Sequence, residues 1–513
     1  MIRFWSLESD PAGQGRIAGA KPVAVLDIGS NSVRLVVYER LARALTVLYN
    51  EKSASTLGRG VAATGRLADT SMASALKAIR RFAMVCRLTE VGEIYPIATS
   101  ATREAENGPE FARAVEDIIG VPVRVLSGAE EAHFSAHGLL SGMPHFKGIV
   151  GDLGGGSLEL TMVEDGHDTG GETYELGVIR LQDDSQMTPG KAASIARDRL
   201  KESSLLSPGK HKSFAAIGGT WRALAKLHQV RCNYPLHMVQ DYTVRTEDIL
   251  PLCDALMESN GDKKLIKGIE TVSGSRRDLL PYGAAVLAEV LRAGKFEEVV
   301  FSALGVREGY LYERLSDEEK AIDPLLQAAE EISTLRSRAP EFAGDLIGGS
   351  TALFELLDVA ESPDQERLRK AACYMSDIGW RAHPDYRGEQ SIQMVAFSDI
   401  VGIDHGGRAF LAQTLAFRYM GFKQKSSSAK LLELAGSELG QRARLIAAYF
   451  RVAYPLTAAM PGILPRTRFS VDSKTLVLHL PADLAFLDGD RMRGRQRQLA
   501  LEAGLKEGTI RVD

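Results

Sequence analysis

Two short stretches determine the organisation of this chain: DIGSNS at residues 27–32 and DLGGGS at residues 152–157. Both have the form Asp-x-Gly-x-x-Ser, and both lie between apolar, β-branched runs, in VAVLDIGSNSVRLVVYE (23–39) and GIVGDLGGGSLELTMVE (148–164). A turn rich in Gly, Ser and Asn between two such runs predicts a β-hairpin. Because each hairpin begins a region of mixed strand and helix patterns, we interpret the chain as a duplicated α/β domain with a cleft between the copies.

The patterns that follow each hairpin are similar. After the first we expect a strand within 42–52, helices at about 71–90 and 109–119, strands at 94–98 and 123–126, and a helix from Ser127 to about 141. After the second we expect a strand at 214–217, a Gly-Gly-Thr turn opening a helix through Leu227, a helix at 281–293, a strand at 299–302 and a helix at 306–315. The pattern of 317–450 is helical, and short strands return in 466–513.

Composition and charge exclude several classes of protein. The 513 residues carry a net charge of −4, so the chain is not a globally basic nucleic-acid binder, and a polyanionic substrate would need a local basic lining. The four cysteines form no CxxC pair, which fits a reducing cytoplasm rather than a disulfide framework. The sequence shows neither a signal peptide nor an apolar run long enough to span a membrane, so we expect a cytoplasmic protein.

The two Asp-x-Gly turns suit the binding of phosphate. A glycine-rich turn lets backbone N–H groups point at an anion, and the hydroxyls of Ser30, Ser32 and Ser157 add donors. Asp27 and Asp152, at the strand ends, can hold Mg²⁺ directly or through water. One such turn is more often an ordinary hairpin, but two copies favour a phosphate site. The chain has no G-x-x-x-x-G-K-[ST] loop, and GGG at 154–156 leads into a strand, which argues against a dinucleotide-binding fold.

The stretch SGAEEA (127–132) starts the helix between the two hairpins. Ser127 fits an N-cap, and Glu130 three residues later completes a capping-box pattern. The pattern by itself does not decide whether Glu130 or Glu131 could activate a water molecule.

Six motifs, in order and at matching spacing, make the chain resemble the exopolyphosphatase/guanosine pentaphosphate phosphohydrolase (Ppx/GppA) family. They are DIGSNSVRLVV, IATSATREAEN, VLSGAEEA, GDLGGGSLEL, AIGGTWRALA and SALGVREGYLYE. The resemblance implies a fold of two ribonuclease-H-like domains of the actin, sugar-kinase and Hsp70 superfold, with an interdomain cleft. A C-terminal, mostly helical HD-like domain and a small α/β tail would follow. The expected boundaries are 1–20 for a flexible tail, 21–146 and 147–316 for the two actin-like domains, 317–460 for the helical domain and 461–513 for the tail domain.

The resemblance also implies roles for individual residues. Glu131 matches the family's catalytic glutamate, which activates a water for attack on the terminal phosphorus. Asp152 and Glu159, with Asp27, match acidic positions near a metal, expected to be Mg²⁺ with Mn²⁺ as an alternative. The expected phosphate-binding residues are Gly29, Ser30, Asn31, Ser32, Arg103, Gly154, Gly155, Gly156, Ser157, Gly218, Gly219 and Thr220.

Further basic residues are candidates for lining the path of a polyanion. They are Arg276, Arg277, Arg307, Lys210, His211 and Lys212, and Arg34 is a weaker candidate. In the helical domain, AACYMSDIGWRAHPDY (371–386) aligns with the His-Asp metal region of the HD fold, but Ser376 stands at the histidine position beside Asp377. We therefore expect no complete metal cluster there, and a role in extending the substrate channel or in forming a homodimer.

The expected function is exopolyphosphatase activity, the Mg²⁺-dependent hydrolysis of the terminal phosphate of inorganic polyphosphate. The main alternative is guanosine pentaphosphate 5′-phosphohydrolase activity, because both substrates present a triphosphate-like end. A small-molecule kinase of the same superfold and a non-catalytic alarmone-binding protein are weaker alternatives, since SGAEEA and the acidic positions are present. No specific nucleic acid and no membrane is expected as a partner.

Overall fold

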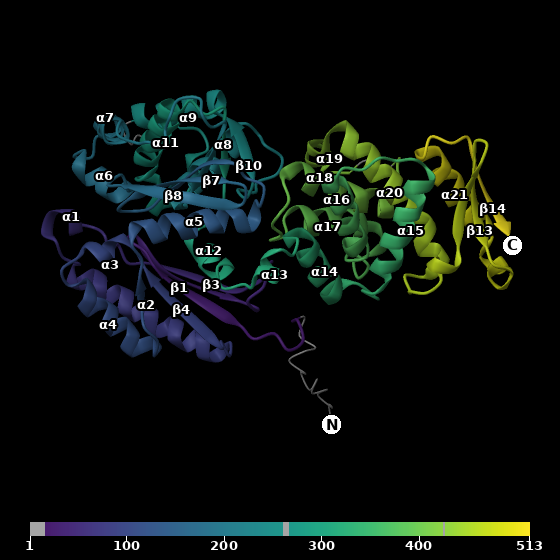
Figure 1. The fold of residues 1–513 in the computed structure, drawn as a ribbon, viewed down its shortest axis with the longest axis horizontal. Coiled ribbons are helices and arrows are strands. Elements are labelled where there is room, and N and C mark those ends of the chain that lie inside the picture. Colours follow the sequence, from purple (N-terminus) through teal and green to yellow (C-terminus); the bar gives the residue numbers. More distant parts are fainter. Residues whose placement is uncertain (1–15, 260–265, 424–425) are drawn as a thin grey trace. The chain divides into compact units, whose positions relative to one another are not determined.

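The computed structural model describes residues 16–259, 266–423 and 426–513. Contacts divide the chain into two units, Gly19–Ile322 and a second that contains Asp323–Asp513, both shown in Figure 1. The predicted tail of 1–20 falls mainly on residues 1–15, which lie outside the described residues. Among the helices that are described, none has the length and apolar character needed to cross a membrane.

The first unit begins with a five-stranded sheet in the order β3-β2-β1-β4-β5. Central strand β1 pairs antiparallel with β2 and parallel with β4. Its successive residues, which point to opposite faces of the sheet, are nearly all buried, which explains its continuous apolar sequence. The strands are β1 (Val23–Ile28), β2 (Ser32–Tyr38), β3 (Val47–Ala54), β4 (Glu93–Ala98) and β5 (Arg124–Val125). The strand expected within 42–52 thus begins later, at Val47, and continues to Ala54.

Helices cover one face of this sheet with a core of their own. Phe82 of α2 and Phe111 of α4 are fully buried there against Leu26 of β1. The helices between β3 and β5 are α1 (Val61–Thr64), α2 (Asp69–Leu88), α3 (Ser100–Glu104) and α4 (Gly108–Ile119).

A six-stranded sheet follows in the order β10-β11-β9-β6-β7-β8. Strand β6 pairs antiparallel with β7 and parallel with β9, which repeats the arrangement of β1, β2 and β4. The repetition confirms the predicted duplication of an α/β domain. The strands are β6 (Gly148–Leu153), β7 (Leu158–Glu164), β8 (His167–Tyr174), β9 (Ser213–Ile217), β10 (Tyr242–Arg245) and β11 (Glu298–Phe301).

The register of the two hairpins is also the same. Asp27 on β1 lies opposite Arg34 on β2, and Asp152 on β6 lies opposite Glu159 on β7. The two copies therefore present the same aspartate but differ in the residue across from it: a cation in the first copy and a carboxylate in the second.

Helices α5 (Gly128–Gly142) and α12 (Val306–Tyr312) lie between the two sheets (Figure 1). Phe134 of α5 and Tyr310 of α12 pack against Val25 of the first sheet, while Leu139 of α5 packs against Val150 of the second. Because α5 is buried from both sides, the residues of its first turn are held in a fixed position between the sheets.

The outer face of the second sheet carries the largest apolar core of the unit, built around Trp221 and Phe214. The helices of this half are α6 (Val178–Asp184), α7 (Pro189–Leu200), α8 (Gly219–Arg231), α9 (Thr246–Glu258), α10 (Gly274–Arg277) and α11 (Leu280–Gly294). A short helix, α13 (Asp317–Lys320), follows α12 at the end of the unit.

The second unit is helical and ends in a three-stranded sheet of order β12-β13-β14. Its longer helices are α14 (Pro324–Arg336), α15 (Phe342–Leu356), α16 (Pro363–Met375), α17 (Arg387–Ala396), α18 (His405–Met420) and α20 (Gly436–Thr457), with the short α19 (Ala429–Leu432) before α20. The sheet comprises β12 (Arg468–Asp472), β13 (Thr475–Leu480) and β14 (Glu507–Val512), and α21 (Asp490–Glu502) connects the last two strands.

Asp377, the residue that remains of the His-Asp pattern, is buried in this unit and bound by two arginines. Arg338 Nη2 lies 2.7 Å and Arg418 Nη2 2.9 Å from Asp377 Oδ1, and the hydroxyl of the neighbouring Ser376 lies 2.7 Å from that of Tyr454. The carboxylate thus joins the segments that follow α14 and α16 to α18 by ion pairs.

Candidate active site

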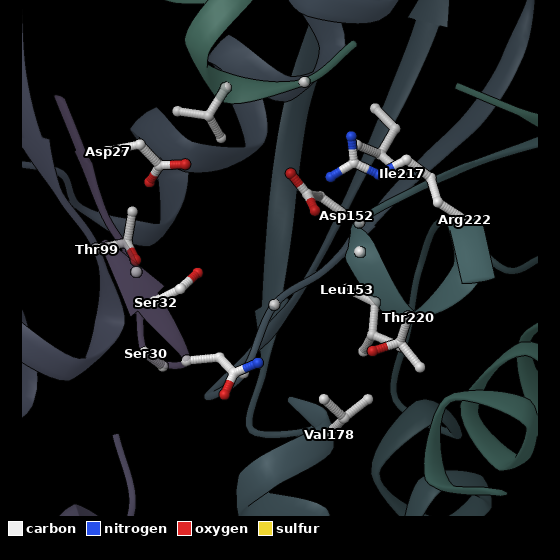
Figure 2. Close-up of a pocket in the computed structure, with 18 of the residues that line it drawn as sticks. Asp27, Ser30, Ser32, Thr99, Asp152, Leu153, Val178, Ile217, Thr220 and Arg222 are labelled. Carbon is white, nitrogen blue, oxygen red and sulfur yellow. The ribbon is translucent and has the colours of Figure 1, made fainter. Parts of the chain in front are cut away.

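A cavity of about 200 Å³ lies where the two hairpin turns of the first unit meet. In Figure 2 the carboxylates of Asp27 and Asp152 face each other across the opening, with the Arg222 guanidinium beside Asp152. The walls come from both turns, the loop after β9 and the start of α12. The cavity is therefore an interdomain cleft within one compact unit.

The two turns have the same backbone geometry and touch each other. The N–H of Gly29 donates to the carbonyl of Ser32 at 3.1 Å, and the N–H of Gly154 donates to that of Ser157 at 3.0 Å. A Cβ atom on Gly155 would lie 2.7 Å from the Cβ of Ser30. Glycine at 155 is thus what allows the two turns to approach closely enough to form one binding surface.

Three acidic side chains of the cleft are held in surroundings that disfavour their charge. Glu131 is 8% and Glu159 3% exposed, and Asp152 accepts a hydrogen bond from the Ser135 hydroxyl. Burial is the main cause that raises the pKa of all three, and repulsion among the carboxylates adds to it. Glu159 Oε1 is buried without a hydrogen-bond partner. A cluster of this kind is suited to receive a divalent cation.

Glu130 and Glu131 have different environments although they are adjacent. Glu130 forms the capping box of α5: it accepts the Ser127 N–H at 2.8 Å, while its own N–H donates to Ser127 Oγ at 3.2 Å. This backbone hydrogen bond, with the ion pair to Arg124, lowers the pKa of Glu130 to about 2. The capping box predicted for Ser127 and Glu130 is therefore confirmed. Glu131 instead lines the cavity.

Burial raises the pKa of Glu131 to about 7, with Asp152 and Asp27 adding to the shift and Arg103 opposing it. A carboxyl group whose pKa lies near neutrality is well matched to accept a proton from water. The shift also makes the free energy of unfolding depend on pH, because Glu131 has a pKa of about 7 in the folded protein against 4.5 for an ordinary glutamate. The folded state is favoured by the proton on Glu131 below pH 4.5, and this contribution is lost as the pH rises through about 7.

Arg103 lies behind Glu131. Its Nη1 donates to the Leu126 carbonyl at 2.6 Å and forms an ion pair with the Glu131 carboxylate. Arg103 is not among the residues that border the cavity, and its contact is to Glu131, whereas the sequence led us to expect a phosphate clamp at this position.

A set of cations also lines the cavity: Arg34, Lys52, Arg222, Arg276 and Arg307. Burial, followed by repulsion from Arg276 and other arginines, lowers the pKa of Lys52 to about 8, and burial with the Arg307 charge lowers that of Arg222 to about 10. One cation of the set has an anionic partner, because Arg307 Nη1 lies 2.9 Å from Asp27 Oδ2. Positive charges that repel one another at such short range are stabilised by a polyanionic ligand.

Comparison with known proteins agrees with this geometry. The sequence profile of the Ppx/GppA phosphatase family matches residues 36–318, and the profile described as exopolyphosphatase, C-terminal, matches residues 325–510. The chain belongs to the Ppx/GppA phosphatase family. The first profile covers most of the unit that holds the cleft, beginning just after the first glycine turn.

Relatives of known name support the assignment. Exopolyphosphatase 2 of Mycobacterium tuberculosis is 28% identical over 293 residues, which are 53% of this chain and 90% of that protein. The crystal structure of an exopolyphosphatase-like protein is 26% identical with a TM-score of 0.51, and covers 57% of this chain and 98% of its own. The structure of an exopolyphosphatase from Cytophaga hutchinsonii, 22% identical with a TM-score of 0.51 over 57% of this chain and 97% of its own, shows the same fold.

The structure brings most of the residues singled out in the Ppx/GppA motifs to the cavity wall. Those that border it are Asp27, Gly29, Ser30, Asn31, Ser32, Glu131, Asp152, Gly154, Gly155, Ser157, Gly218, Gly219 and Thr220. Glu159 lies beneath the wall, within electrostatic range of Glu131 and Asp152. Gly156 packs against Ser100, since a Cβ there would lie 2.7 Å from the serine Oγ.

Among the basic candidates, Arg34, Arg276 and Arg307 border the cavity, whereas Arg277 and residues 210–212 do not. Arg277 instead donates to the Val272 carbonyl at 2.6 Å. Two cations were missed by sequence reasoning, Lys52 and Arg222. Lys52 lies across from Arg34 in the β2–β3 register, and Arg222 is in the first turn of α8, so each stands beside a residue that was recognised.

Gly218 gives a prediction about the loop after β9. Its φ of +111° is a backbone conformation that residues with a side chain rarely adopt. A Cβ atom at this position would also lie 2.4 Å from the Leu153 carbonyl oxygen. We expect Gly218→Ala to lower the free energy of unfolding by about 2 kcal/mol or more, measured as the urea midpoint. Gly190→Ala, whose Cβ would meet nothing within 4 Å, is the matched control and should change little. Equal midpoints for the two variants would contradict the account of this loop.

Proposed function

We propose that this protein is an exopolyphosphatase that removes the terminal phosphate of inorganic polyphosphate, with Glu131 activating the attacking water. The observation that carries the proposal is the content of the cleft: one cavity holds a buried carboxylate with a near-neutral pKa together with a set of clustered cations and two glycine turns. A base and a polyanion site in one cavity are what water attack on a phosphoric anhydride requires.

The reaction follows from these positions. The phosphate chain lies along the cations, and its terminal phosphoryl group is bound by the turns at Gly29 and Gly154 and by the Gly218–Thr220 loop, where α8 begins. The unprotonated Glu131 carboxylate accepts a proton from water as the water oxygen forms a bond to the terminal phosphorus. The bond between that phosphorus and the bridging oxygen breaks, and the bridging oxygen stays with the shortened chain. Arg222 and Arg276 are placed to stabilise the charge that develops there.

The acidic residues fit a divalent cation. Asp152 and Asp27 border the cavity, and Glu159, which is buried within electrostatic range of Asp152, has no hydrogen-bond partner on Oε1. Carboxylate oxygens are the ligand type that Mg²⁺ prefers. Asp152 and Glu159, with Asp27 directly or through water, would hold Mg²⁺, with Mn²⁺ as an alternative. The ion would neutralise charge on the phosphate oxygens.

The choice of polyphosphate over guanosine pentaphosphate rests on the comparisons. The C-terminal match is to an exopolyphosphatase profile, and the relative from M. tuberculosis bears that name. The test is phosphate release from long-chain polyphosphate, guanosine pentaphosphate and ATP, assayed in parallel. We expect the highest kcat/KM for polyphosphate. A higher value for guanosine pentaphosphate would favour the alternative activity, and phosphate transfer from ATP to an acceptor would favour a kinase.

The pKa of Glu131 predicts the pH dependence of the reaction. Because the base works unprotonated, kcat/KM should rise with pH and level off above about 7. The profile is measured with long-chain polyphosphate at constant ionic strength.

Arg103→Gln separates the enzyme's titration from that of the substrate. Arg103 lowers the pKa of Glu131, so its removal should move the midpoint of the profile to higher pH. A midpoint that stays in place would assign the titration to the phosphate chain and not to Glu131.

A further inference from the structure

A second group of possible metal ligands lies outside the cleft, on the helix that carries Glu131. His133 and His137 are four residues apart on α5, so both project from the same side of the helix, and their ring centroids are 4.2 Å apart. Glu313, just after α12, completes the group: one ligand atom from each of the three residues lies within 4.8 Å of the other two. We propose that His133, His137 and Glu313 form a binding site for a transition-metal dication of the Zn²⁺ type.

Asp168 on β8 contacts one ring nitrogen of each of the two histidines. Its carboxylate lies 3.1 Å from Nδ1 of His133 and 3.1 Å from Nε2 of His137. This pairing leaves one nitrogen of each ring, Nε2 of His133 and Nδ1 of His137, to act as ligands. A carboxylate that takes the second ring nitrogen fixes the tautomer and orientation of a metal-binding histidine.

The contact between His137 and Glu313 also has the geometry of a ligand pair. His137 Nδ1 is buried within ion-pair distance of Glu313 Oε1, but the two atoms do not form a hydrogen bond of acceptable geometry. A ring nitrogen and a carboxylate oxygen that converge without a hydrogen bond are arranged as two ligands of one ion would be. Glu313 has one further cation nearby, since Lys320 Nζ lies 3.7 Å from Oε1.

The site can close around an ion with small movements. Ligand atoms of a tetrahedral Zn²⁺ site, with bonds of about 2.0–2.1 Å, lie about 3.3 Å apart. Because the ligand atoms here lie within 4.8 Å of one another, the widest pair must close by about 1.5 Å or less, while His137 Nδ1 and Glu313 Oε1, which already lie closer than a ligand pair, must move slightly apart. His133 borders an open pocket together with Glu313, so its ring has room to turn and water has access to a fourth position. The contraction would leave Asp168 in place as the outer partner.

The chemistry of this site differs from that of the cleft. Imidazole nitrogens favour Zn²⁺ and related metals, whereas the oxygen ligands at Asp152 favour Mg²⁺. The proposed ion would connect α5 to α12, and Asp168 would extend the link to β8. The two helices already touch closely, because a Cβ on Gly309 would lie 1.8 Å from the Phe134 carbonyl. A bound metal should therefore raise the thermal stability of the first unit.

The test uses the full chain, freed of metal with a chelator and titrated with Co²⁺ as a spectroscopic probe in an excess of Mg²⁺, which is added to fill the site proposed in the cleft. We expect one equivalent of Co²⁺ to give the visible d–d absorption of a site with nitrogen ligands, and Zn²⁺ to displace it. The double variant His133→Gln/His137→Gln should lose both the absorption and the metal-dependent rise in Tm. Absorption that persists unchanged in this variant, or no absorption in the wild-type chain, would overturn the proposal.

Two further variants distinguish the site from other ligands and from misfolding. His228→Gln is the matched control, because His228 is also a helical histidine, lies 3.9 Å from the sulfur of Cys232, and could bind metal there. The His228→Gln variant should keep the absorption unchanged. If this variant lost the absorption, the metal would be bound at His228 and Cys232 and not at the proposed site. Asp168→Asn keeps the three ligands and should weaken Zn²⁺ binding by about 10- to 100-fold. Unaltered affinity in that variant would overturn the role given to Asp168.

Discussion

Glu131→Gln should lower kcat for polyphosphate hydrolysis by about 10²- to 10⁴-fold, the range that a positioned general base contributes. Glutamine has nearly the same shape, and its side-chain oxygen can still accept from Arg103, so the cleft should keep its structure. What the variant loses is the carboxylate that takes the proton from water. KM should change little, because Glu131 acts on the water and the cations and turns bind the phosphate chain. Steady-state phosphate release measures both constants.

Glu130→Gln is the control for this variant. The two glutamates are adjacent in α5, but Glu130 accepts the N–H of its own N-cap residue, a role that glutamine can also fill. We expect a loss of about 1 kcal/mol or less in the free energy of unfolding and turnover close to that of the wild type. If both variants kept full turnover, Glu131 would not be the base. If Glu130→Gln alone abolished turnover, the assignment of the two carboxylates would be reversed.

Asp152→Asn should reduce kcat/KM by at least about 100-fold at Mg²⁺ concentrations that saturate the wild type, because a metal ligand loses its charge. The variant should remain folded, since asparagine still offers an oxygen to the Ser135 hydroxyl that binds Asp152. Wild-type protein should show a rise in Tm with Mg²⁺, and this rise should shrink in the variant. Thermal melts with and without Mg²⁺, with phosphate release, measure both effects.

Asp165→Asn serves as the control for the metal variant. Asp165 is an exposed carboxylate just after β7, paired with Lys147 and away from the cavity. It should leave the Mg²⁺ response and the turnover unchanged. An Asp152→Asn enzyme with a normal requirement for Mg²⁺ would remove Asp152 from the metal site.

The parts of the site that the sequence predicts well are those with local causes. The turn at Gly29 and the turn at Gly154 are each specified by a few consecutive residues between apolar runs, and the capping box by Ser127 and Glu130. Their geometry depends on neighbours in the chain, so the pattern is enough. The first turn is repeated 125 positions later, from Asp27 to Asp152, and this repetition in the sequence predicts the duplicated domain.

The parts that the sequence does not predict depend on the approach of distant segments. Lys52 and Arg222 reach the cavity because β3 ends and α8 begins at it, and the sequence around each residue does not by itself show that its side chain enters the cavity, although Arg222 lies within the motif AIGGTWRALA. The motif at Arg103 predicts a phosphate clamp, but the ion pair between Arg103 and Glu131 joins two residues 28 positions apart, which the motif does not reveal. The convergence of His133, His137 and Glu313 likewise depends on the crossing of α5 and α12, which lie far apart in the sequence.

The central claim is that water, activated in this cleft, attacks the terminal phosphorus of a polyphosphate chain. The most direct measurement is hydrolysis of long-chain polyphosphate in water enriched in the heavy oxygen isotope, with mass analysis of the released phosphate and of the remaining chains. The account predicts one heavy oxygen atom in each released phosphate and chains that shorten one phosphate at a time. Unlabelled phosphate passed to an acceptor, or chains cut internally into fragments, would contradict it.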